Sequence, residues 1–128
     1  MKFTTTRKVV LVALIALFSQ FSLAQDAGAA LKDIADIVAS INHFPSDADK
    51  AKLMAISQDM NLPEPLRGMA TAVSNISHAA DADGKALMAD IIASDTAPDN
   101  AKALAGVIAG LSHVASDEAK ATLAQNFP

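Results

Sequence analysis

The chain has no cysteine, no tryptophan and no tyrosine among its 128 residues. The lack of cysteine excludes disulfide bonds, thiol catalysis and thiolate metal sites. Of the five phenylalanines, only Phe44 and Phe127 lie after residue 24. The core must therefore consist of alanine and larger aliphatic side chains. Burial of apolar surface contributes about 25 cal/mol per Å², and each alanine buries little surface. We expect a domain of modest stability that associates with itself or with another protein.

Sequence signatures of catalysis are also missing. There is no glycine-rich phosphate loop, no Gly-x-Ser-x-Gly elbow and no His-x-x-x-His spacing. The pairs Ser77-His78 and Ser112-His113 are adjacent in sequence, so on a helix their side chains point in different directions. The methionines at helical spacing are best explained as core filler. The sequence thus predicts a protein that is not an enzyme and has no cofactor.

The N-terminus has the features of a secretory leader. Lys2, Arg7 and Lys8 form a basic region, and residues 9–18 contain no polar side chain. The small residues around Ala24 are suitable for cleavage, which predicts a signal peptide over residues 1–24. An uncleaved anchor is the alternative, but a span needs about 20 apolar residues and Ser19 interrupts this run. We expect a mature domain of residues 25–128 in the periplasm or outside the cell, with no membrane attachment.

Removal of the leader makes the chain strongly acidic. All 14 acidic residues but only seven of the ten basic ones follow residue 24, which gives 7 − 14 = −7 with neutral histidine. Such a surface repels phosphate backbones and anionic lipid headgroups. We therefore expect no nucleic-acid partner.

A repeat of 35 residues organises the mature chain. Its clearest mark is Ile41-Asn42-His43, which returns as Ile76-Ser77-His78 and Leu111-Ser112-His113. Aligned on the histidines, the units are residues 29–63, 64–98 and 99–128. Their apolar, alanine and lysine or arginine columns coincide, and Pro63 and Pro98 close the first two units.

Each unit has the pattern of a helical hairpin. Apolar residues at helical spacing precede each histidine. Ser46, Asp81 and Ser116 are N-cap residue types that begin a second helix. Breaks are expected at residues 61–63 and 96–98. The predicted fold class is all-α, with six short helices in three hairpins that form either a small α-solenoid or a closed helical bundle.

The period belongs to the size class of tetratricopeptide-type repeats. The large aromatic residues of that pattern are absent, and Pro63 and Pro98 do not fall where its proline stands. The sequence therefore predicts the architecture class and no family.

The only histidines of the chain are the three of the repeat, His43, His78 and His113. The simplest interpretation places each in the last turn of a helix, where it interacts with the helix dipole. A metal site is the alternative, but equivalent positions in a stack should lie about 10 Å apart or farther, too far to share one ion. A third interpretation makes the histidines a partner-contact ridge that responds to pH.

A weak candidate for a metal site is the acidic stretch around Gly84. If Gly84 is position six of a calcium loop, Asp81, Asp83 and Asp90 fall at positions three, five and twelve. Position one would be Ala79, which has no side-chain oxygen. A helix start capped by Asp81 explains the same residues without an ion.

Taken together, these patterns predict an exported, non-enzymatic repeat protein that binds another protein, or itself as a homo-oligomer. The alternative is a histidine-dependent metal-binding or pH-sensing envelope protein. A small enzyme is the third hypothesis.

Overall fold

The computed structural model describes residues 26–128. The expected signal peptide, residues 1–24, lies outside the described residues. None of the helices that the structure describes is long and apolar enough to cross a membrane.

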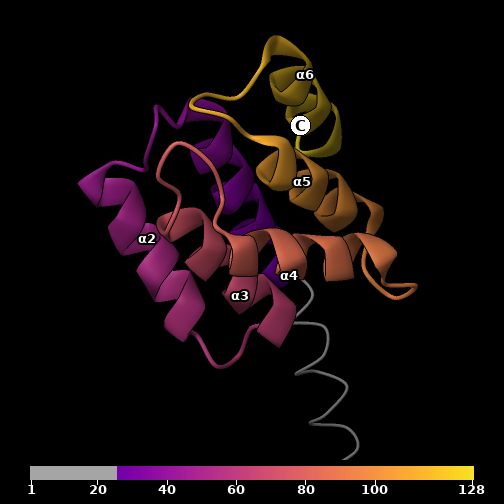
Figure 1. Cartoon of the computed structure of the whole chain (residues 1–128). Helices are drawn as coiled ribbons and strands as arrows, with labels where there is room; N and C mark the ends of the chain where they lie inside the picture. Colours follow the sequence, from indigo (N-terminus) through magenta and orange to yellow (C-terminus); the bar gives the residue numbers. More distant parts are fainter. Residues whose placement is uncertain (1–25) are drawn as a thin grey trace, which may run out of the picture.

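Six helices make up the described part of the chain (Figure 1). The first covers residues 26–40, and the others are α2 (Asp47–Gln58), α3 (Glu64–Ser74), α4 (Ala82–Ala93), α5 (Asp99–Gly110) and α6 (Asp117–Asn126). Residues 26–128 contain isolated β-bridges but no strand. The all-α prediction, with six helices, is confirmed.

The second helix of each unit begins at the predicted cap. The side-chain oxygens of Ser46, Asp81 and Ser116 accept the backbone N–H three residues ahead, at 3.1, 2.7 and 3.0 Å. Each cap satisfies one of the amides that the first turn of a helix leaves without a partner. The repeat therefore encodes the start of α2, α4 and α6 by the same physical means.

Prolines mark the boundaries between consecutive units of the repeat. Pro63 and Pro98 are the N-cap residues of α3 and α5. Their fixed φ suits a helix start, and the residue before a proline is disfavoured in helical geometry. The predicted breaks at residues 61–63 and 96–98 are confirmed.

The core repeats with the same period. Three columns of equivalent side chains are at most 1% exposed: Ile34, Met69 and Leu104; Ala35, Ala70 and Ala105; Val38, Val73 and Ile108. All nine come from the first helices of the units, and the alanine column lets these helices approach closely. The second helices add the equivalent Leu53, Met88 and Leu123.

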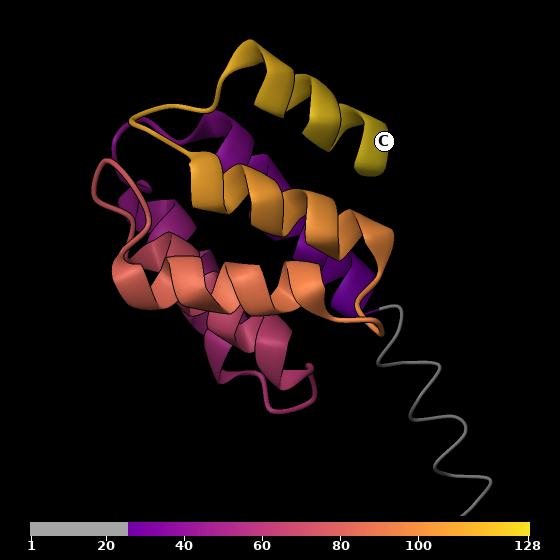
Figure 2. The same cartoon turned by 45° about the vertical axis from the view of Figure 1, so that its right-hand side comes forward.

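The units contact one another in sequence order, and the ends of the chain also meet. Helix α2 packs on α3, and α4 packs on both α3 and α5. In Figures 1 and 2 the loop after the helix 26–40 lies beside the loop between α5 and α6. A β-bridge between Asn42 and Val114 joins these two loops. The first unit therefore touches the third, and the site described below lies at this junction.

Candidate metal centre

The three histidine loops form a closed ring of backbone hydrogen bonds. The N–H of His43 donates to the carbonyl oxygen of His113 at 2.6 Å, and His78 donates to His43 at 2.6 Å. His113 completes the ring by donating to His78 at 2.5 Å. Each histidine thus gives one bond and receives one. The ring holds the three histidine backbones in fixed positions around a common centre.

All three histidines have a left-handed backbone conformation, with φ of 69°, 70° and 69°. They are the only non-glycine residues with positive φ in the described part of the chain. At His113 the N–H of Val114 donates to the carbonyl oxygen of Ser112 at 2.8 Å. A bond from residue i+2 to residue i across a positive φ is the pattern of the classic γ-turn, which is rare and strained. This bond is present in the third unit alone, whereas all three units share the positive φ, which costs a residue with a Cβ about 1 kcal/mol.

Glycine would adopt this conformation at lower cost, because it has no Cβ. Yet none of the glycines in residues 26–128 has a positive φ. The chain has histidine three times where glycine is the easier choice. Strain that persists at equivalent positions points to a requirement for the side chain.

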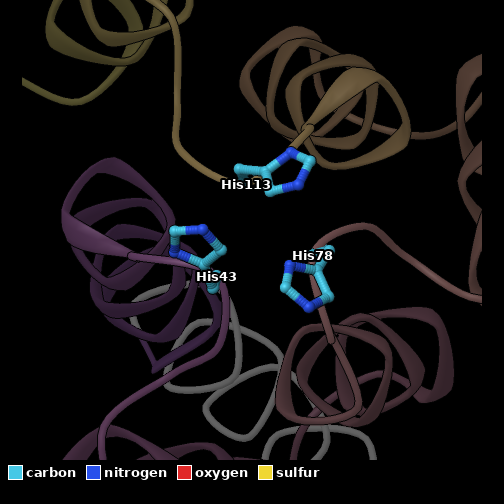
Figure 3. A group of neighbouring side chains, drawn as sticks. All are labelled: His43, His78 and His113. Atoms are coloured by element: carbon cyan, nitrogen blue, oxygen red, sulfur yellow. The ribbon is translucent and has the colours of Figure 1, made fainter.

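The three imidazole rings lie against one another (Figure 3). Their centroids are 5.1, 5.1 and 5.0 Å apart, and His43 meets each of the other rings nearly edge to face. The expected separation of about 10 Å or more is wrong. That estimate placed equivalent residues along the axis of a stack, whereas the three loops lie around one centre.

The donor atoms of the rings are close enough to hold a metal ion. One ring nitrogen from each histidine lies within 4.8 Å of the others. Three nitrogens at 2.0–2.1 Å from a tetrahedral ion are about 3.3 Å apart. The nitrogens must therefore approach one another by up to about 1.5 Å to share one ion. In the described part of the chain no other group of three His, Cys, Asp or Glu side chains comes this close.

Neighbouring side chains orient two of the rings. Nδ1 of His43 lies 2.6 Å from Oδ1 of Asn42, and Nδ1 of His113 lies 3.1 Å from Oγ of Ser112. A carboxamide oxygen only accepts, so Asn42 holds the proton of His43 on Nδ1 and leaves the Nε2 lone pair free. This arrangement is typical of histidine ligands, which donate their other N–H to a neighbouring oxygen.

The site is open to solvent. His43 is half-buried, and His78 and His113 are exposed. The residues that follow two of the histidines, Phe44 and Val114, are 57% and 48% exposed. An ion on the three nitrogens would keep at least one coordination position for water or another ligand.

The position of the histidines differs from the expectation that they end a helix. The helix 26–40, α3 and α5 end three or four residues before His43, His78 and His113. The two imidazoles with a hydrogen-bonded side-chain neighbour meet Asn42 and Ser112, not helix carbonyls. The expectation that each histidine lies in the last turn of a helix is therefore wrong.

The structure does not bring the three aspartates together. Asp81 caps α4 and accepts from the N–H of Gly84, and Asp83 and Asp90 lie within the helix itself. The rise of about 1.5 Å per residue separates Asp90 from Asp81 by about 13 Å along the axis. A helix also lacks the loop geometry that a calcium site of this kind needs. Asp81 and Asp83 belong to the start of the helix, and Asp90 lies near its other end.

Sequence reasoning singled out the histidines but not the residues that orient them. Asn42, Ser77 and Ser112 occupy one column of the repeat, directly before the histidines. A polar side chain that precedes a histidine in every unit was the available signal. A comparison with protein-family models, curated proteins and solved structures finds no match for this chain.

Proposed function

We propose that this protein binds a divalent transition-metal ion through His43, His78 and His113. The observation that carries the proposal is the convergence of three imidazole nitrogens within 4.8 Å of one another. Each unit of the repeat contributes one ligand, and water or another small ligand completes the coordination.

The donor set selects the class of metal. Three neutral imidazoles suit zinc, copper(II) and nickel, whereas calcium and magnesium prefer oxygen ligands. Affinity should follow the usual order for divalent ions, with copper(II) bound more tightly than nickel or zinc. The open position suits a site that takes up and exchanges its ion.

Two further features support a ligand role. The strained backbone at all three histidines is difficult to explain if the side chain is dispensable. The contacts of Asn42 and Ser112 to Nδ1 match those that orient histidine ligands in metal proteins.

The proposal includes a closed arrangement of the three units. One ion on three ligands requires the first and third units to be neighbours, and an open solenoid keeps them apart. The hydrogen bond from His43 to His113 and the bridge between Asn42 and Val114 support closure. The leader predicts that the ion is bound in the periplasm or outside the cell.

A protein-binding role is a second proposal. It is supported by large apolar side chains on the surface, among them Phe44 and Val114 beside the histidines. A partner that covers these residues would also supply the open coordination position with a ligand.

Isothermal titration of the leader-free protein with zinc and copper(II) tests the metal proposal. The protein must be purified without a histidine tag. We expect one ion per chain and no heat of binding in the variant with His43→Asn, His78→Asn and His113→Asn. Asparagine is the matched replacement because it tolerates positive φ. Absence of binding to the natural sequence, or equal binding to the triple variant, would refute the proposal.

A further inference from the structure

A second candidate site lies at the other end of the inner helices. A cavity of about 480 Å³ is lined by the first turns of α3 and α5, together with residues of the helix 26–40 and of α4. His78 and His113 follow the opposite ends of α3 and α5. Helix α3 has 11 residues, and at a rise of about 1.5 Å per residue it is about 16 Å long. The cavity and the histidine ring lie at opposite ends of this length and are therefore separate sites.

The cavity arises where the repeat departs from its own pattern. Leu31 and Leu66 occupy equivalent positions in the first two units, and the third unit has Ala101 there. All three are buried and line the cavity. Alanine lacks the isopropyl group that the two leucines carry, so the third side of this layer is left unfilled.

The lining is almost wholly apolar. Eleven of its fourteen residues are alanine, proline, leucine, isoleucine or methionine, and the others are Asp90, Ser94 and Thr96. The hydroxyls of Ser94 and Thr96 lie 3.1 Å apart and contact each other. Among the fourteen lining residues Asp90 is the one ionisable group, and its side chain is exposed. Apolar cavities of 300–1,000 Å³ with a few polar groups are typical of small-molecule sites.

Acids outnumber bases among the lining residues and their direct sequence neighbours. Direct sequence neighbours of lining residues add four exposed acids: Asp26, Glu64, Asp95 and Asp99. They also add three bases, Lys32, Arg67 and Lys102. Of these, Lys32 pairs with Asp36 at 3.8 Å, and Nε of Arg67 donates to the carbonyl oxygen of Leu62 at 3.2 Å. No ion pair within residues 26–128 neutralises Asp90.

From these observations we propose that the cavity binds a small cationic amphiphile. The apolar chain of such a molecule fills the space beside Ala101, and its ammonium group lies near Asp90. An anionic amphiphile of equal length would meet Asp90 and an overall charge of −7 on residues 26–128 (7 basic and 14 acidic residues). The cationic head distinguishes this ligand from a fatty acid.

Fluorescence-displacement or calorimetric titration with three ten-carbon amphiphiles tests the proposal. The probes are decyltrimethylammonium, decylsulfonate and the uncharged decanoyl-N-methylglucamide, each below its micelle-forming concentration. We expect the cation to bind at least five times more tightly than the anion. Equal affinities for the two, or no saturable binding of any probe, would overturn the proposal.

Two variants locate the site. Ala101→Leu restores the leucine of the other units, so it should weaken binding of the cation at least tenfold. Ala86→Leu, on the exposed face of α4, is the matched control and should leave binding unchanged. Asp90→Asn should reduce the preference for the cation over the uncharged probe about two- to fivefold, as expected for an exposed charge. Unaltered affinity in Ala101→Leu would contradict the assignment.

A measurement on the natural sequence avoids dependence on the folding of Ala101→Leu. The methyl NMR signals of Ala97 and Ala101 should shift during titration with decyltrimethylammonium, and those of Val114 should not. The reverse pattern would place the ligand at the histidine end and would also refute the proposal. Neither outcome bears on metal binding, which is tested separately.

Discussion

The backbone N–H of His43 donates to the carbonyl oxygen of His113 over 2.6 Å, although the two residues are 113 − 43 = 70 positions apart. This bond connects the first unit of the repeat with the third. With the bonds from His78 to His43 and from His113 to His78, it fixes three left-handed residues around one point. The metal proposal depends on this ring, because it brings the imidazoles together.

Glycine at one of the histidines should separate stability from binding. We expect His78→Gly to raise the free energy of unfolding of the metal-free protein by up to about 1 kcal/mol, since it relieves a positive φ. The same change should abolish tight metal binding, because only two imidazoles remain. Urea unfolding with and without a chelator measures both effects. A control, Ser77→Gly, changes the preceding exposed residue without relieving a positive φ.

Metal should stabilise the folded protein, and acid should remove this effect. At a free metal concentration one hundred times the Kd, the gain is about 2.7 kcal/mol. Protons compete with the ion for the imidazole nitrogens, so the metal-dependent gain is present at neutral pH and is lost as the pH falls. Thermal unfolding at pH 7.5 and pH 5, with zinc or with chelator, measures this. A metal-dependent gain that is equal at both pH values would contradict histidine ligation.

Asn42 should act as a positioning residue for His43. We expect Asn42→Ala to weaken metal binding about tenfold, because the oxygen that orients His43 is removed. Ser77→Ala is the matched change in the second unit, where no bond between Ser77 and the His78 ring is present, and it should have a smaller effect. Asn42→Asp should keep the metal affinity close to that of the natural sequence, since a carboxylate also accepts from Nδ1. An affinity of Asn42→Asp as low as that of Asn42→Ala would indicate that Asn42 has only a structural role.

The aspartate that caps α4 should contribute to stability but not to calcium binding. We expect Asp81→Ala to cost about 1 kcal/mol, the usual effect of losing an N-cap. Calcium should leave the melting temperature of both proteins unchanged. Asp83→Ala, a change on the exposed face of the same helix, serves as the control. A rise in the melting temperature with calcium, lost in Asp81→Ala, would restore the calcium-loop interpretation.

Local sequence chemistry predicted the helices well, because their boundaries depend on nearby residues. Ser46, Asp81 and Ser116 cap the helices that follow them through bonds to residues only three positions ahead. Pro63 and Pro98 mark the breaks through the backbone geometry of proline itself. The period of 35 residues likewise placed the core columns, such as Val38, Val73 and Ile108, on equivalent faces.

The site depended on information that periodicity does not contain. A repeat of three equivalent histidines has the same sequence whether the units lie along an axis or around a centre. Contacts between the first and third units, such as the His43–His113 bond and the Asn42–Val114 bridge, support the arrangement around a centre. The positive φ of the histidines was also hidden, because sequence rules associate that conformation with glycine. The estimate of ligand spacing failed because it placed the three histidines along the axis of a stack.

The most direct test of the metal centre is a crystal structure of the leader-free protein grown with zinc, with data collected at the zinc absorption edge. We expect one anomalous peak per chain, about 2.0–2.1 Å from one nitrogen each of His43, His78 and His113. Crystals that contain zinc but show no peak among the three imidazoles, or show it only at surface carboxylates, would refute the metal centre.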